Sequence, residues 1–131
     1  MIEAVINGRK KAIGIHLYRD GKIFRRIRIL VQKEENQDHN RATIMGIKYA
    51  LLSIKDKTEP VTLYINAFAQ RLKDLGFKSI AQKEPAEELK KSYTSFPSIV
   101  TKRFQDHQDH QQVHSLADVA LPAPEGVILI N

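Results

Sequence analysis

The chain contains no cysteine, which excludes a disulfide framework and any metal site built from thiolates. Because a chain without disulfides fits a reducing compartment, we expect a cytoplasmic protein. No apolar stretch approaches the roughly 18 residues that a membrane-spanning helix needs, so we expect no membrane partner. The first four residues show no basic region followed by an apolar run, so we expect no signal peptide.

The composition is that of an ordinary globular protein with a basic surface. The chain has 131 residues, of which 42% are hydrophobic and 27% are charged, and this length is sufficient for one domain with a real core. The formal net charge is +6. A basic surface attracts polyanions and so favours nucleic acid as a partner. Many basic proteins bind no polyanion, however, and charge alone leaves both interpretations open.

Three β-prone segments open the chain. The first covers residues 1–8 and ends in Asn7-Gly8, and the next two are separated by Asp20-Gly21. Because both dipeptides favour tight turns, the segments predict an antiparallel meander. In the third segment, 22–32, the pattern predicts an apolar face and a basic face typical of an edge strand. The apolar face is formed by Ile23, Ile27, Ile29 and Val31, and the basic face by Arg26 and Arg28.

Helices and strands alternate in the remainder of the chain. Residues 61–65 predict a buried strand of the parallel kind, and 98–104 predict a fifth strand. Helices are predicted over 40–55, over 67–75, from Pro85 onward and over 113–121. The order predicts an α/β fold with a mixed five-stranded sheet flanked by helices. Strands 1, 2 and 3 form the antiparallel meander, and strands 4 and 5 are parallel.

Four short motifs occur along the chain in a particular order. They are Ile6-Asn7-Gly8, Asn40-Arg41-Ala42-Thr43, Leu63-Tyr64-Ile65-Asn66-Ala67 and the segment Ser115 to Leu121. Together with the order of the elements, they resemble the ribonuclease H family, whose active site is four acids that hold two divalent metals. The resemblance covers residues 1–121 as one domain and leaves 122–131 as a C-terminal tail.

The resemblance implies that three of the four catalytic acids are replaced in this chain. Asn7 stands at the first-strand aspartate, Thr43 at the helix glutamate and Asn66 at the fourth-strand aspartate, while Asp118 is the surviving acid. Two-metal hydrolysis needs carboxylates to hold its cations, because neutral oxygens do not offset two close positive charges. We therefore expect a catalytically inactive protein with no bound metal and no cofactor. A residual metal-dependent nuclease is an alternative.

Without the resemblance, Asn7 and Asn66 have an ordinary structural interpretation. Asparagine before glycine is common in turns, and asparagine after a strand often caps a helix. Under that interpretation neither residue has ever been a metal ligand. Only the order of the motifs favours the other interpretation.

A group of basic and polar residues lies beside two of these motifs. The group comprises Arg9, Lys10, Lys11, His39, Asn40 and Arg41. By the resemblance, the helix start that contains the last three lines a groove for a nucleic-acid strand, and helix amides can also hold phosphate. The sequence therefore predicts a groove that binds duplex or RNA–DNA hybrid without cutting it. The alternative is a solvated basic turn with a helix cap. We find no basic–aromatic interleaving of the kind typical of single-strand binders.

Three histidines precede the surviving acid. His107, His110 and His114 would share one helix face with Asp118 if the whole segment were helical, and His110 and His114 have the spacing of a zinc helix. Gln111 stands where that motif has its glutamate, so we do not expect a zinc peptidase. The alternative is a polar loop that leads into a helix.

The C-terminal tail favours a third hypothesis, a homodimer or partner-binding scaffold. Residues 127–130 are continuously apolar and have no place in the ribonuclease H fold as the resemblance implies it. Such a segment adds a strand to its own sheet, adds a strand to a partner's sheet edge, or packs against the core of its own chain. The sequence leaves these alternatives open.

Overall fold

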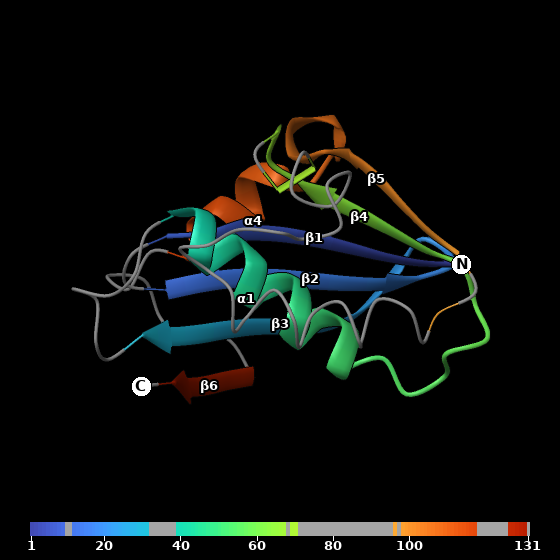
Figure 1. Ribbon diagram of the computed structural model, residues 1–131, viewed down its shortest axis with the longest axis horizontal. Coiled ribbons are helices and arrows are strands. Elements are labelled where there is room, and N and C mark those ends of the chain that lie inside the picture. The colour runs from blue at the N-terminus through green and yellow to red at the C-terminus, as the bar shows by residue number, and fades with distance from the viewer. Residues whose placement is uncertain are drawn as a thin grey trace.

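The computed structural model describes residues 1–9, 12–31, 39–67, 69–70, 96, 98–117 and 126–130, and its elements are shown in Figure 1. The strands are β1 (Ile2–Gly8), β2 (Ala12–Arg19), β3 (Lys22–Val31), β4 (Val61–Ile65), β5 (Ile99–Arg103) and β6 (Gly126–Ile130). The helices are α1 (His39–Leu52), the 3-10 turn η3 (Phe104–Asp106) and α4 (His110–Leu116). Among these described residues, no helix is both long and apolar enough to cross a membrane.

The strands form one mixed sheet in the order β5-β4-β1-β2-β3-β6. β1 and β2 are antiparallel, as are β2 and β3, which confirms the predicted meander. β4 pairs with β1 and β5 pairs with β4, both in parallel. The five predicted strands are therefore present in the predicted arrangement. The predicted helix from Pro85 onward lies outside the described residues, and of the helix predicted over 67–75 the described part is 67 and 69–70.

The C-terminal tail supplies a sixth strand that the sequence did not assign to the sheet. β6 pairs in parallel with the second half of β3, from Ile27 opposite Gly126 to Val31 opposite Ile130. It lies at the edge of the sheet beside β3 (Figure 1). Of the alternatives left open for the tail, the structure therefore shows addition of a strand to its own sheet.

A β-bulge changes the alternation of side chains along β3. Tyr18 pairs with Ile23 and Leu17 pairs with Arg25, so that Phe24 has no counterpart on β2. The extra residue shifts the pleat by one position. The prediction that Ile23 shares a face with the later isoleucines of this strand is therefore wrong, because Ile23 packs with Tyr18 in a different cluster. The later isoleucines belong to the main core and are Ile27 and Ile29.

The main core lies between the sheet and α1, which crosses one face of the sheet in Figure 1. Its fully buried members include Ile6, Ile13 and Ile47. Gly46 allows the helix to approach closely, because a Cβ there would lie 2.6 Å from Ile6 Cγ2 and 2.8 Å from Ile13 Cγ2. The helix predicted over 40–55 thus runs from His39 to Leu52 and covers β1 and β2.

The opposite face of the sheet carries a smaller core beneath α4 and η3. Val5, Tyr18 and Tyr64 alternate with main-core residues along their strands, and Val113 of α4 packs on them. The helix predicted over 113–121 overlaps α4 at 113–116, but α4 begins earlier, at His110, and ends at Leu116. This face differs from the other because its core contains hydroxyl and imidazole groups that need hydrogen-bond partners.

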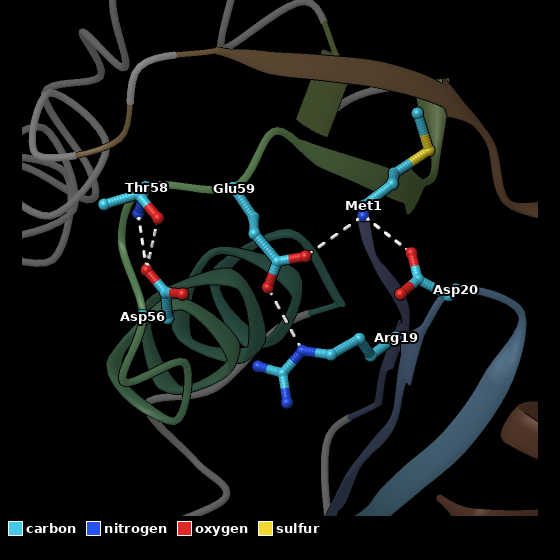
Figure 2. A network of polar contacts seen from close by, with 6 residues as sticks. All are labelled: Met1, Arg19, Asp20, Asp56, Thr58 and Glu59. Carbon is cyan, nitrogen blue, oxygen red and sulfur yellow. Dashed lines mark hydrogen bonds and ion pairs between the residues drawn. The ribbon is translucent and has the colours of Figure 1, made fainter.

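An exposed network of ion pairs lies at the start of β1 (Figure 2). The Met1 amino group lies 3.0 Å from Asp20 Oδ1 and 3.1 Å from Glu59 Oε1, and Arg19 Nε lies 3.1 Å from Glu59 Oε2. Hydrogen bonds with Asp20 and Glu59 raise the pKa of the amino group. Surface ion pairs contribute little to stability, so the main effect is to orient the β2–β3 hairpin against the segment before β4.

Candidate functional site at the carboxyl ends of β1 and β4

The site is positioned by two neighbouring parallel strands that end at the same edge of the sheet. β1 and β4 pair from Ile2 opposite Val61 to Val5 opposite Tyr64. Asn7 and Asn66 each follow the last pair by two residues, so both lie at this edge of the sheet. In α/β sheets, the carboxyl ends of parallel strands are where ligands bind. The fold therefore brings together two of the residues that the sequence singled out.

Gly8 lets the start of α1 pack directly on the end of β1. A Cβ at this position would lie 2.4 Å from the backbone nitrogen of Thr43 and 2.6 Å from the backbone carbonyl carbon of Ala42. Real Cβ atoms do not approach backbone this closely, so the position requires glycine. The contact places Thr43 beside the strand end that carries Asn7.

Thr43 and Asn66 form a direct hydrogen bond. The Asn66 Nδ2 amide donates to Thr43 Oγ1 at 3.1 Å, and Thr43 is fully buried. The other side of the same amide caps the helical turn that follows β4, because Asn66 Oδ1 accepts the backbone N–H of Ala69 at 2.8 Å. Both the amide nitrogen and the amide oxygen of Asn66 therefore form hydrogen bonds within the protein.

Asn7 contacts the last helix instead of Thr43 or Asn66. Its Nδ2 lies 3.4 Å from Nδ1 of His114, and the donor and acceptor roles depend on the histidine tautomer. Asn7 is half-buried and His114 is exposed. The contact brings α4 to the end of β1. His114 precedes Asp118 by four residues in the sequence. Asp118 itself lies outside the described residues.

The basic residues of the predicted groove are described only in part. Arg9 follows Gly8, is partly exposed, and its backbone N–H donates to the carbonyl of Ala12 at 2.9 Å. The close approach of Gly8 to Ala42 places the first turn of α1 beside the connection between β1 and β2. That first turn consists of His39, Asn40 and Arg41, while Lys10 and Lys11 lie outside the described residues.

The three histidines do not gather into a metal site. His107 precedes α4, and its ring lies 4.8 Å from the ring of Tyr18 and 4.8 Å from that of Tyr64. His110 opens the helix, with its Nδ1 2.9 Å from the carbonyl of His107, and His114 contacts Asn7. In the described part of the chain, no group of three His, Cys, Asp or Glu residues is arranged to hold a metal ion. The segment is not helical throughout, because the helix begins at His110.

A cluster of titratable side chains lies beneath α4, and it was not predicted from the sequence. Tyr18 Oη donates to Asp109 Oδ2 at 2.5 Å and lies 3.1 Å from His16 Nδ1. The backbone N–H of Asp109 donates to His107 Nδ1 at 3.0 Å, which leaves the ring proton of neutral His107 on Nε2. The pattern that could have predicted this cluster is in β2, where His16 and Tyr18 alternate with apolar residues and therefore share one face of the strand.

Burial and neighbouring charges change the pKa values of His16 and Tyr18. Burial, with the nearby Arg26 guanidinium acting in the same direction, lowers the pKa of His16 to about 4. Burial also raises the pKa of Tyr18, and the hydrogen bond to Asp109 acts in the same direction. At neutral pH, His16 is therefore an uncharged imidazole and Tyr18 is an intact donor. The cluster fastens α4 to the sheet through the hydrogen bond from Tyr18 to Asp109.

Comparison with known proteins supports the fold. No protein-family profile matches this sequence, and no curated protein matches it. Among the solved structures, the chain is similar to RNase H1 from the halophilic archaeon Halobacterium salinarum NRC-1, with a TM-score of 0.70 and 17% sequence identity. The match covers 91% of this chain and 96% of that chain. The chain therefore has a ribonuclease H-like fold, as the four motifs implied, and at this identity the likeness shows the fold alone.

Proposed function

We propose that this protein is a catalytically inactive ribonuclease H-like protein that binds nucleic acid, as duplex or RNA–DNA hybrid, without cleaving it. The observation that carries the proposal is the hydrogen bond between Asn66 and Thr43. By the family resemblance, both residues stand where catalytic acids would hold metal ions. In this chain, Asn66 donates a hydrogen bond to Thr43 instead.

The chemistry of these side chains argues against metal-dependent hydrolysis. Divalent magnesium binds through carboxylates, phosphates and water, and a two-metal mechanism needs both cations beside the attacked phosphate. Thr43 is neutral and fully buried, and the Asn66 oxygen accepts a backbone N–H. Asn7, which stands at the third position, is also neutral. Asp118 is the one acid that the resemblance leaves for the site, and one carboxylate does not offset two cations.

The charge of the molecule supports binding. The net charge of +6 attracts phosphates, and Arg9 directly follows the strand end that carries Asn7. The first turn of α1, which contains Arg41, packs beside the same strand end through Ala42 and Gly8. With Lys10 and Lys11 between Arg9 and β2, the proposed binding surface is Arg9, Lys10, Lys11, His39, Asn40 and Arg41.

Cleavage of a labelled RNA–DNA hybrid in Mg²⁺ or Mn²⁺ tests the inactivity. We expect no cleavage above buffer, with a ribonuclease H of known activity as the positive control. Cleavage by the wild-type protein that disappears in Asp118→Ala would overturn the proposal. Cleavage that persists in that variant would identify a contaminating nuclease.

Gel-shift titration of the hybrid over a salt series tests the binding. We expect affinity to fall steeply with salt, because phosphate contacts release counterions. Arg9→Ala should weaken binding and reduce the salt slope by about one unit. Lys55→Ala is the matched control, since Lys55 is exposed and lies after the distal end of α1, and it should bind like wild type. Absence of binding at low salt would contradict the proposed function.

A further inference from the structure

The tip of the β2–β3 hairpin carries an exposed surface that combines an aromatic ring with basic side chains. We define this hairpin surface as Arg19, Lys22, Phe24, Arg25 and Arg26, all of which are exposed. We propose that the hairpin surface binds single-stranded nucleic acid, with a base stacked on Phe24 and the basic side chains on the phosphates. Nothing in the fold comparison assigns a role to this surface.

The β-bulge is what exposes Phe24. Since Phe24 has no counterpart on β2, it belongs to neither core, while Ile23 before it packs with the smaller core. Phe24 is 41% exposed. Among the aromatic side chains that the structure describes, it is the only one in the exposed class. A bulge that re-aims a side chain is a device used at functional sites.

Arg19 supports the ring from one side. Its guanidinium carbon lies 5.0 Å from the Phe24 ring centroid, and its Nε is bound to Glu59, which fixes the position of the arginine (Figure 2). A cation on one side of an aromatic ring is a favourable contact. The arrangement orients the phenyl ring before any ligand binds.

The charge around the ring is positive. At the hairpin tip, Asp20 and Glu59 are already compensated, because Asp20 pairs with the Met1 amino group and Glu59 pairs with Met1 and Arg19. Lys22, Arg25 and Arg26 form no ion pair with any other residue in the described ranges. Consecutive strand residues point to opposite faces, so Arg25 and Arg26 extend the positive charge around both sides of the strand.

These features favour a single strand over other polyanions. An unpaired base offers a free π-face to an aromatic side chain, whereas the bases of a duplex are already stacked on each other. A flexible strand also follows charges that lie on both sides of a β-strand. An acidic peptide would contact the basic side chains but would make no use of the exposed ring.

The sequence contains the corresponding signal between Lys22 and Arg26, which reads Lys-Ile-Phe-Arg-Arg. Phe24 thus lies among basic residues, and the expected absence of basic–aromatic interleaving does not hold for this segment. Regular alternation of side chains along the strand did not predict that Phe24 is exposed. The β-bulge explains its exposure.

The hairpin surface goes beyond the proposed function, because the residues at its tip (Arg19, Lys22 and Phe24) lie at the other end of the sheet, while Arg25 and Arg26 lie further along β3, opposite Leu17 and His16. The backbone N–H of Asp20 donates to the carbonyl of Met1 at 3.0 Å, so the hairpin lies at the start of β1. Asn7 lies six residues further along the strand, which is about 20 Å at roughly 3.3 Å per residue. Either site can therefore fail while the other stands.

Fluorescence anisotropy with a labelled oligo-dT tests the inference, with an abasic strand of the same length as the second probe. Phe24→Ala should weaken oligo-dT binding by at least about fivefold and leave abasic binding unchanged. The double variant Arg25→Ala, Arg26→Ala should weaken both probes and reduce the salt slope by about two units. Phe24→Tyr keeps a stacking ring and should bind like wild type.

Two control variants and a competitor complete the design. Val100→Ala removes an exposed apolar side chain on β5, Lys57→Ala removes an exposed cation elsewhere, and both should bind oligo-dT like wild type. Equal affinity of wild type and Phe24→Ala for oligo-dT would overturn the inference. So would equal affinity of wild type for both strands, or displacement by polyglutamate at the same concentration as by oligo-dT, because either result describes a general polyanion surface.

The two proposals fail separately. Arg9→Ala should leave oligo-dT binding unchanged if the hairpin surface is the single-strand site. Absence of hybrid binding by the wild-type protein, with its oligo-dT binding intact, would remove the proposed function and retain this inference. Circular dichroism of each variant confirms that it is folded, and Phe24 is exposed enough that its replacement should not unfold the chain.

Discussion

The Asn66 side-chain amide donates a hydrogen bond of 3.1 Å to the fully buried hydroxyl of Thr43. The two residues are separated by 23 positions in the sequence and meet because α1 packs on the end of β1 next to β4. The same Asn66 side chain caps the turn after β4 through Ala69. A neutral, internally satisfied pair thus joins α1 to the carboxyl end of β4.

Replacement of Asn66 should destabilise the protein through both of its hydrogen bonds. We expect Asn66→Ala to lower the free energy of unfolding by about 1–3 kcal/mol, because it removes a helix cap and a bond to a buried hydroxyl. Urea denaturation measures the change. Thr58→Ala, which removes the exposed hydrogen bond from the Thr58 hydroxyl to Asp56, is the control and should cost less than about 0.5 kcal/mol. Equal costs would show that the Asn66 contacts are not structural.

If the proposed function is right, carboxylates introduced at positions 7 and 66 should create a cation site. In the double variant Asn7→Asp, Asn66→Asp, two carboxylates lie at the ends of β1 and β4 and attract a hard divalent cation. We expect Mn²⁺ to raise the Tm of this variant by a few degrees, since a ligand that binds only the folded state stabilises it. Wild type should show no such shift in differential scanning fluorimetry. A wild-type shift of equal size would contradict the proposed loss of the metal site.

Gly8 should tolerate no side chain. In Gly8→Ala, the new Cβ would meet the backbone of Thr43 and Ala42, and backbone does not yield cheaply, so we expect a loss of about 2–3 kcal/mol. Gly21→Ala is the matched glycine control. Gly21 has φ +79° but open space around it, so its replacement should cost only about 1 kcal/mol of conformational strain. Thermal unfolding ranks the two variants, and the opposite order would refute the close approach of α1 to β1.

Stability should fall in mild acid because His16 resists protonation in the folded state. Its pKa is lowered from 6.5 to about 4 by burial and by Arg26, with His107 acting in the same direction and Asp109 opposing. Between about pH 6.5 and pH 4, the unfolded chain binds a proton at this position and the folded chain does not. The free energy of unfolding therefore decreases as pH falls through this window, by about 1–2 kcal/mol after allowance for solvent screening.

Urea unfolding at a series of pH values from 7 to about 4 measures this dependence. His16→Gln removes the titrating group and retains a polar side chain beside Tyr18, so the difference between wild type and variant isolates His16 from the other groups that titrate. We expect the decrease to be smaller in the variant by the same about 1–2 kcal/mol. Identical pH profiles would contradict the burial of a neutral His16.

Much of the fold could be predicted from local sequence. The Asp20-Gly21 dipeptide determined the hairpin turn, and the structure places both residues at positive φ as that turn requires. The continuous apolar run of 61–65 determined a buried parallel strand. Side-chain period and turn chemistry act over a few residues, so they are legible before any tertiary contact is known. The order of these elements then defined the ribonuclease H-like class.

The tertiary structure alone decided which distant groups meet. Phe24 is exposed because of a bulge in the pairing of β2 with β3, and β6 pairs with β3 although the rest of the fold lies between them in sequence. Asn7, Thr43 and Asn66 were singled out one by one, and only packing showed that two of them bind each other while Asn7 contacts His114. Contacts between distant segments depend on how layers pack around the whole core, and no local pattern encodes that geometry.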